Sequence, residues 1–299
     1  MLALCVNTAC SSDDSDEPTD PDTPLEQPVD PTRPRVNIVS RAEEGSSTET
    51  APLQAGLFMV NYQDNRPDEL LPTDNYVNNQ LMTWANEAWS TSTPIYWNDM
   101  DTQADFYAYA PYMANVDDAR QLPVSVSTDQ RTDEAFAQSD FLWGTVQGQT
   151  PTTEGFSLLL SHQFSRLTVV VTAEAGFSDG ELQASDVSVT IGGTRTSATA
   201  DLQTGILSIS DNATANDVRC HPNGDLSYTA ILLPQQVPFS NLIQVDWQGN
   251  KYTLQNSFKL ESRRQYTLTV KLKKTKSGFD IGIEGWDILP EDFGGTIGG

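Results

Sequence analysis

Short runs that are apolar or alternate between apolar and polar residues recur from residue 53 onward, with turn residues between them. In the first half they fall at 56–60, 95–97, 104–109, 122–126 and 156–160, and in the second half at 167–171, 187–191, 198–202, 207–209, 228–233, 243–247, 252–254 and 266–272. Their lengths and their β-branched and aromatic residues are typical of strands. Helix-period patterns are rare, and only 133–138 and 179–184 predict a turn or two of helix. The pattern predicts an all-β, sandwich-like protein.

The composition changes near residues 150–155, where Pro, Thr and Gly cluster. We place a domain boundary there, with an N-terminal β-sandwich domain over 35–152 and a C-terminal one over 153–278. The length of 299 residues allows about two domains of ordinary size. No run approaches the ~18 apolar residues of a membrane-spanning helix.

A polar segment precedes the first domain. Residues 11–34 hold mainly Asp, Glu, Pro and Thr, with only Leu25 and Val29 as large apolar residues, so we expect a disordered acidic tether. A short β-prone run then lies between Arg35 and Arg41, and small polar residues follow it. This arrangement predicts a strand with flanks that a protease can reach.

The start of the chain resembles a bacterial lipoprotein signal. An apolar run leads through small residues to Cys10, and an acidic Ser/Asp run follows. We therefore interpret 1–10 as a lipoprotein signal and Cys10 as the acylated N-terminus of the mature chain, palmitate included. Only Met1 precedes the apolar run, so this signal is incomplete: the start is misassigned or the chain is truncated. The alternative is that Cys10 is a buried or reactive cysteine behind an apolar start.

Charge and cysteine content restrict the function further. The net charge of −24, from 41 acidic and 17 basic residues, repels phosphates and argues against nucleic-acid binding. If Cys5 is removed with the signal and Cys10 is acylated, Cys220 remains alone and no internal disulfide forms.

Catalytic and metal-binding patterns are missing from the sequence. His162 and His221 are the only histidines and do not form a zinc-binding pattern with Cys220. The acidic run at 13–17 lacks the glycine and the spaced ligands of a calcium loop. There is no phosphate-binding glycine loop and no Gly-x-Ser-x-Gly motif. We expect no enzymatic activity, no cofactor and no metal.

Several aromatic motifs carry a resemblance to a known family. Those at 56–60, 94–97, 105–112, 139–144, 160–167 and 285–287 are similar, in order, to motifs of the fimbrillin family of Bacteroidales, the type V pilins. The resemblance runs from about Val36 to the C-terminus. One departure is at Gly56, after which such proteins often carry an acidic residue. The resemblance implies two transthyretin-like β-sandwich domains in tandem, export as a lipoprotein precursor, cleavage after an arginine by a trypsin-like surface protease, and polymerisation by strand exchange.

The sequence offers candidates for the cleavage step. Arg41 lies just behind the first β-prone run and fits the implied site. Arg35 is an alternative, whereas Pro34 hinders cutting after Arg33. Cleavage at Arg41 would remove the strand that contains Val36 and Ile38 and expose unpaired backbone groups. The competing interpretation is that these arginines are ordinary tether residues.

The C-terminal tail, residues 279–299, is a candidate donor strand. Apolar residues alternate with polar residues or glycine in its first part and continue beyond it: Phe279, Ile281, Ile283, Trp286 and Ile288. Fully extended, the tail spans roughly 70 Å, at ~3.3 Å per residue. A donated strand binds through main-chain hydrogen bonds while its alternate side chains fill pockets. The alternative is that this segment is the last strand of its own sandwich.

Taken together, these features predict a structural subunit of an adhesive fimbria on the outer membrane. Its expected partners are further copies of itself, other pilus subunits, the processing protease, the outer membrane before maturation, and a host protein or glycan ligand. One alternative is a surface glycan-binding lipoprotein, favoured by the aromatic residues between 84 and 112. Another is a tip adhesin or anchor of the same pilus. The sequence identifies neither the host ligand nor the protease.

Overall fold

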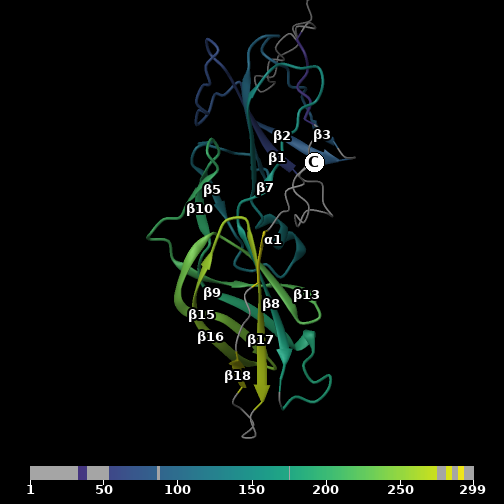
Figure 1. Cartoon of the computed structure of the whole chain (residues 1–299), viewed down its shortest axis with the longest axis vertical. Coiled ribbons are helices and arrows are strands. Elements are labelled where there is room, and N and C mark those ends of the chain that lie inside the picture. The colour runs from purple at the N-terminus through teal and green to yellow at the C-terminus, as the bar shows by residue number, and fades with distance from the viewer. Residues whose placement is uncertain are drawn as a thin grey trace, which may run out of the picture.

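The computed structural model describes residues 33–38, 54–85, 88–174 and 176–274, together with the backbone of 281–284 and 289–292 (Figure 1). Strands dominate this part of the chain, which confirms the all-β prediction. The expected helical turn at 133–138 is present as α1 (Asp133–Gln138), whereas the second lies later than predicted, as a 3₁₀ turn at Ala184–Asp186. None of the helices in the ranges just given is long and apolar enough to span a membrane.

The first half is built on one sheet with the strand order β3-β2-β1-β4-β6-β7. Its strands are β1 (Gln54–Asn61), β2 (Val77–Ala85), β3 (Ala88–Thr91), β4 (Ala104–Ala110), β6 (Leu142–Gln149) and β7 (Ser161–His162). The two central strands, β1 and β4, are buried on both faces. Successive side chains of a strand point to opposite faces, so a strand covered on both sides needs a continuous apolar run. This explains the unbroken run at 56–60.

Each face of this sheet packs against a different core: one belongs to the first half alone, and the other is shared with the second half. Leu57 and Met59 face the first core, which also contains Trp97, Phe106 and Phe156. The expected strands at 95–97 and 156–160 do not form regular ladders there. They are joined to their neighbours by isolated bridges such as Arg35–Tyr96 and Ile38–Phe156. These irregular segments close the first core on the side away from the sheet.

The second half is a two-layer sandwich. One layer has the order β12-β9-β15-β16 and the other β13-β14-β8-β17-β18. The strands are β8 (Ser165–Ala173), β9 (Val187–Arg195), β12 (Ala215–Arg219), β13 (His221–Gly224), β14 (Ser227–Leu232), β15 (Gln235–Trp247), β16 (Asn250–Leu260), β17 (Arg264–Lys274) and β18 (Ile281–Glu284). β17 runs parallel to β8, and the other pairs are antiparallel. Inward-facing side chains of both layers form the second core.

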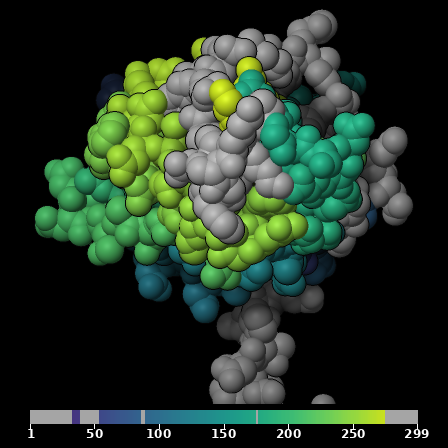
Figure 2. Space-filling view, turned by 90° about the horizontal axis from the view of Figure 1, so that it is seen from below, coloured from purple at the N-terminus to yellow at the C-terminus, as the bar shows by residue number. Residues whose placement is uncertain are grey.

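The two halves share a third core. β5 (Leu122–Ser125) belongs to the first half but pairs with β10 (Ser197–Asp201), which in turn pairs with β11 (Ile206–Ser208). The third core lies on the face of β1 that carries Phe58 and Val60, and it includes residues of both halves. Figure 2, a view from the end formed by the second half, shows the segment near residues 200–215 (green) projecting to one side. The halves are therefore joined by packing and by strand pairing as well as by the chain.

Candidate functional site

Residues 34–38 lie along the first half (purple in Figure 1) and are paired with it through two isolated bridges, Arg35–Tyr96 and Ile38–Phe156. The amide of Val36 donates to the carbonyl of Ile95 over 2.8 Å, and the amide of Trp97 donates to the carbonyl of Pro34 over 3.0 Å. On the other side, the amide of Phe156 donates to the carbonyl of Asn37 over 3.1 Å. The segment is thus held by its backbone between two neighbours, and we call it the leader strand.

The leader strand alternates between buried and exposed side chains. Pro34, Val36 and Ile38 are buried, whereas Arg35 and Asn37 are exposed. Val36 and Ile38 belong to the first core. Fully burying a side chain of this size stabilises a fold by about 1.5–3 kcal/mol. The leader strand therefore covers apolar surface that would otherwise meet water.

A cavity of about 360 Å³ that is open to solvent lies beside the leader strand. It is lined by residues 35–38 and by Met82, Trp89, Thr91, Ile95 and Gly155. Trp89 packs edge-on against Trp84, with the two ring centroids 5.4 Å apart. We call the space occupied by the leader strand together with this cavity the leader seat.

The leader strand is also fixed at its beginning. Arg33 Nη1 donates to the Tyr76 hydroxyl over 3.2 Å and to the Asn98 carbonyl over 3.5 Å. The next residue, Asp99, accepts hydrogen bonds from the Thr102 hydroxyl and from the backbone of residues 101 and 102. These bonds, of which the one from the Thr102 side chain contributes most, lower the pKa of the Asp99 carboxyl to about 2. A tightly bonded turn therefore presents the carbonyl that Arg33 contacts.

The C-terminal tail pairs with its own chain. Ile281–Glu284 forms β18, which pairs with the C-terminal part of β17 (271–274). Leu289–Asp292 forms β19, which pairs with the N-terminal part of β17 (264–267). Both ladders are antiparallel, and the register moves by one residue between them. The backbone positions of Ile281 and Ile283 are thus in an outer strand. Three predicted donor residues, Phe279, Trp286 and Ile288, lie outside the described residues, as do Cys10 and Arg41.

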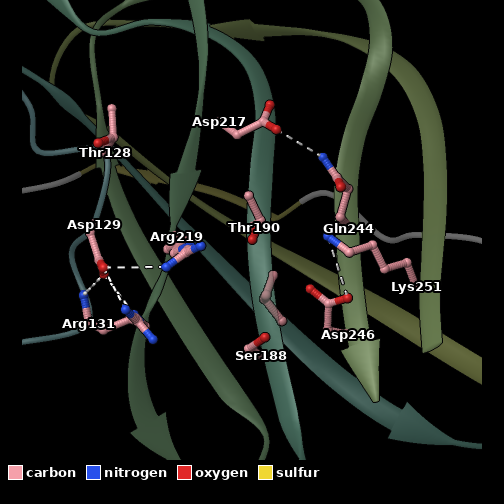
Figure 3. Close-up of a pocket in the computed structure, with 11 residues that line it drawn as sticks. Thr128, Asp129, Arg131, Ser188, Thr190, Asp217, Arg219, Gln244, Asp246 and Lys251 are labelled. Carbon is pink, nitrogen blue, oxygen red and sulfur yellow. Dashed lines mark hydrogen bonds and ion pairs between the residues drawn. The ribbon is translucent and has the colours of Figure 1, made fainter. Parts of the chain in front are cut away.

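A polar depression that sequence reasoning missed lies on the second half (Figure 3). It has a volume of about 670 Å³ and is lined by the loop at 128–131 and by residues of β9, β12, β15 and β16. Asp129 is bonded to Arg131 at 2.6 Å and lies 3.7 Å from Arg219, while Asp246 lies 3.9 Å from Lys251. The Arg131 side chain lowers the pKa of the Asp129 carboxyl to about 2. The lining includes no aromatic side chain on which a sugar ring could stack.

The aromatic residues that favoured a glycan-binding surface mostly pack inside the protein. Trp97, Tyr107 and Tyr109 are fully buried. Burial raises the pKa of Tyr107 and of Tyr109 to about 12. Trp84 and Trp89 are partly buried against the first core. These rings therefore support the fold of the first half rather than an exposed aromatic platform.

Both histidines lie near α1, where the two halves meet. His162 Nδ1 is 2.8 Å from Asp140 Oδ1 in a fully buried pair, and His221 Nε2 is 2.8 Å from Asp133 Oδ1. Cys220 is a buried free thiol whose pKa is raised by that burial. Within the described ranges, no group of three or more His, Cys, Asp or Glu residues is placed to hold a metal ion.

Comparison with known proteins decides the family. A sequence model described as fimbrillin-like matches residues 40–286. The chain belongs to the fimbrillin-like family. This confirms the resemblance inferred from the aromatic motifs.

Individual relatives agree with that family. The chain is 24% identical, over 315 aligned residues, to a candidate fimbrium subunit of Bacteroides uniformis, Fim1C, with 100% of this chain and 96% of that protein covered. Among solved structures, a candidate cell adhesion protein of Bacteroides ovatus has a TM-score of 0.66 at 17% identity, covering 87% of this chain and 98% of that one. A second, from Bacteroides uniformis, has a TM-score of 0.62 at 19% identity, covering 89% and 100%. These structures show that the fold is shared.

Proposed function

We propose that the protein is a structural subunit of an adhesive surface fimbria, made as a lipoprotein precursor, cleaved after Arg41 and polymerised by donor-strand exchange. The observation that carries the proposal is the leader strand. It is a bridge-paired segment that precedes β1 and is held by backbone hydrogen bonds and by alternate buried side chains. Its removal would leave unpaired backbone groups and an uncovered apolar core, which a donated strand could cover in the same way.

The position of the leader strand favours Arg41 over Arg35 as the cleavage site. The bond after Arg35 lies inside the hydrogen-bonded segment, because the next amide, that of Val36, donates to Ile95. A cut there would also leave Val36 and Ile38 attached to the body of the protein. A cut after Arg41 separates the whole leader strand, so that it can be exchanged as one unit.

The C-terminal tail is the proposed donor, through Phe279, Ile281, Ile283, Trp286 and Ile288. Its support is that β18 and β19 pair with the outer side of β17. An outer strand can leave without interrupting the hydrogen bonds between β17 and β8. In a precursor, pairing of the tail with its own chain would keep the donor covered until an acceptor seat is open.

The remaining parts of the proposal follow from this role. Acylation of Cys10 would hold the precursor on the outer membrane, and cleavage would release the subunit into an extracellular fibre. Its partners would be further copies, other pilus subunits, a trypsin-like surface protease, and a host protein or glycan. We assign it no catalytic activity, cofactor or metal.

Limited proteolysis tests the maturation step. The purified chain is treated with limiting trypsin, and the products are analysed by N-terminal sequencing and by electrophoresis for SDS-resistant ladders. A new N-terminus at Ala42 together with ladders supports the proposal. An Arg41→Ala variant should remain a monomer, whereas Arg35→Ala should behave like the unchanged chain. Polymer formed normally by Arg41→Ala would contradict the proposed maturation.

A further inference from the structure

The floor of the polar depression on the second half is set by strand register. Thr190 of β9 lies opposite Arg219 of β12 on one side and opposite Gln244 of β15 on the other. Val189 and Ile191, the neighbours of Thr190 in β9, are buried in the second core. Alternate side chains of a strand point to opposite faces, so this row faces outward, with adjacent strands about 4.8 Å apart. A guanidinium, a hydroxyl and an amide thus lie side by side on the open face of the sheet.

A second polar row runs beside the first. Ser188 of β9 lies opposite Asp246 of β15, which in turn lies opposite Lys251 of β16. Lys251 Nζ is 3.9 Å from the Asp246 carboxylate, which is beyond hydrogen-bond distance. Figure 3 shows Ser188 and Thr190 between the two charged sides of the depression. Hydroxyl groups therefore occupy its centre, and charged groups surround them.

The first half supplies one wall of the depression. The amide of Arg219 donates to the Thr128 carbonyl over 2.9 Å, and the amide of Gln130 donates to the Arg219 carbonyl over 3.0 Å. The loop at 128–131 thus extends the sheet beyond β12, its edge strand. The depression is complete when the two halves are docked.

The charges of the depression leave Arg219 able to bind an anion. Arg131 donates to both carboxylate oxygens of Asp129, from Nε over 2.8 Å and from Nη2 over 2.6 Å. Arg219 Nη1 lies 3.7 Å from the same carboxylate, beyond hydrogen-bond distance, and its side chain is 59% exposed. The charged groups of the lining balance to zero in a chain of net charge −24: Asp129, Asp217 and Asp246 against Arg131, Arg219 and Lys251. An anion is therefore repelled less here than by the chain as a whole.

We propose that this depression binds a glycan that carries a carboxylate, with the carboxylate on Arg219 and sugar hydroxyls on Thr190, Gln244 and Ser188. The guanidinium fork of arginine matches the two oxygens of a carboxylate. Sugar hydroxyls both donate and accept hydrogen bonds, so they suit a floor of hydroxyl, amide and carboxylate groups. The volume of about 670 Å³ is within the range of small-molecule sites. This inference names a ligand class for the adhesive role proposed above and requires no strand exchange.

The floor favours a sugar over an acidic peptide. Extended peptides bind through main-chain hydrogen bonds to an open sheet edge or through apolar side chains in pockets. Here β9 and β15 are paired on both sides, and the loop at 128–131 occupies the edge of β12. Val189, the apolar residue of the lining, is buried in the second core. A peptide would find neither kind of contact.

The charge balance favours a carboxylate over a phosphate. Asp217 and Asp246 lie on the same open face as Arg219, within the same lining. A phosphate monoester carries a charge of about −1.5 to −2 at neutral pH, and these two carboxylates oppose the part of that charge that one guanidinium does not neutralise. A sugar acid carries a single negative charge and meets less repulsion.

A glycan array probed with the labelled, uncut full-length chain tests the ligand class. The array carries glycans that end in glucuronic, galacturonic or sialic acid, each beside its methyl ester. The best-bound acid and its ester are then titrated against the chain and followed by ligand-observed NMR. We expect binding of the acid and at least about tenfold weaker binding of the ester, since the ester loses a charge-assisted hydrogen bond.

Three variants test the site. Arg219→Ala should weaken binding of the acid by at least about tenfold and remove its advantage over the ester, whereas Thr190→Val should weaken acid and ester alike by about threefold to tenfold. Lys259→Ala is the matched control, because it removes one exposed positive charge of the same sheet outside the lining. It should bind like the unchanged chain. Unchanged Tm values confirm that the variants are folded.

Several results would overturn the proposal. These are an array on which no carboxylated glycan is bound, equal binding of acid and ester, and equal binding by Arg219→Ala and Lys259→Ala. Binding of an Asp/Glu peptide that depends on Arg219, with no glycan bound, would make the depression a peptide site instead. Trypsin-treated Arg219→Ala should still form SDS-resistant ladders, so that loss of glycan binding with ladders intact contradicts this inference alone. Glycan binding without ladders in the unchanged chain contradicts the proposed assembly alone.

Discussion

The side-chain amide of Gln130 forms two hydrogen bonds with the backbone of Ile231. Its Nε2 donates to the Ile231 carbonyl and its Oε1 accepts from the Ile231 amide, both over 2.8 Å. Gln130 is fully buried and belongs to the loop before α1, whereas Ile231 lies in β14 of the second half. The neighbouring Asp129 forms a parallel bridge with Arg219 of β12. The loop of one half therefore acts as an extra strand for the other.

Replacing Gln130 by alanine should destabilise the whole subunit. The change leaves a buried amide and a buried carbonyl of Ile231 without partners, and each such group costs about 1–3 kcal/mol. We expect a loss of about 3 kcal/mol in the free energy of unfolding measured with urea. Gln255→Ala, which removes an exposed glutamine bonded to Asn241, is the matched control and should lose little. Equal losses of unfolding free energy in the two variants would show that the two hydrogen bonds between Gln130 and Ile231 do not stabilise the contact between the halves.

The turn between β10 and β11 should not tolerate a side chain at Gly205. Its φ is +73°, and a Cβ there would lie 2.6 Å from the Trp143 ring, whose Nε1 donates to the Leu202 carbonyl over 2.8 Å. Gly249 has a similar φ of +80° but open space around it. Gly249→Ala should cost about 1 kcal/mol for the backbone conformation alone, and Gly205→Ala about 1–3 kcal/mol more for the clash. Calorimetry of the two variants checks this, and similar Tm values would contradict docking of the turn on Trp143.

Truncation of Ile38 should loosen the leader strand selectively. Ile38→Ala removes a side chain of the first core, and such changes cost about 2–5 kcal/mol when the site is fully packed. Because the cavity already adjoins this residue, we expect about 2 kcal/mol and faster release of the leader fragment from trypsin-cut protein. Asn37→Ala, on the exposed side of the same strand, is the control. Unchanged release in Ile38→Ala would mean that side-chain burial does not retain the leader strand.

Acid should remove the contribution of Asp129. Its pKa in the folded protein is about 2, against 3.8 for the unperturbed group, because Arg131 donates to the carboxylate. A depressed folded pKa stabilises the protein above the unfolded pKa, and this stabilisation is lost as the pH falls from about 4 to 2. The stability difference between the unchanged chain and Asp129→Asn should shrink over that interval. A difference that stays constant from pH 6 to pH 2 would contradict this assignment.

Removal of the tail should leave all three cores folded. The hydrogen bonds between β17 and β8 do not involve the tail, so deleting residues 279–299 should preserve a cooperative thermal transition while abolishing polymer ladders. A chain lacking only 293–299 keeps both described tail strands and serves as the control. Loss of folding on the longer deletion would favour the alternative, in which the tail is a permanent strand of its own sandwich.

Local patterns in the sequence predicted much of this fold. The continuous apolar run at 56–60 lies in β1, and the alternating run at 266–272 forms most of β17. A strand buried on both faces has a continuous apolar run and a strand buried on one face alternates, so both patterns are visible in the sequence. The β-prone run around Val36 predicted a short strand, and the structure has isolated bridges there in place of a regular ladder. Its neighbours, Ile95 and Phe156, could not be predicted, because they meet it through single bridges without a repeating pattern.

Contacts between the halves could not be predicted from such local patterns. β5 and β10 are more than 70 residues apart in the chain, and nothing in residues 122–125 indicates which strand they pair with. Gln130 is a single polar residue in a loop, and its burial depends on a carbonyl and an amide supplied by a distant strand. The cavity of the leader seat depends on Met82 and Trp89, which are brought there by β2 and β3.

The pairing of β5 with β10 also sets an order of events while the chain is being made. The first half needs residues 197–208 to complete the layer that covers Phe58 and Tyr107. A growing chain that has reached only residue 152 therefore exposes one face of its central sheet, and the missing layer arrives with a later part of the polypeptide. The N-terminal half stays unfinished until synthesis has passed residue 208, the end of β11.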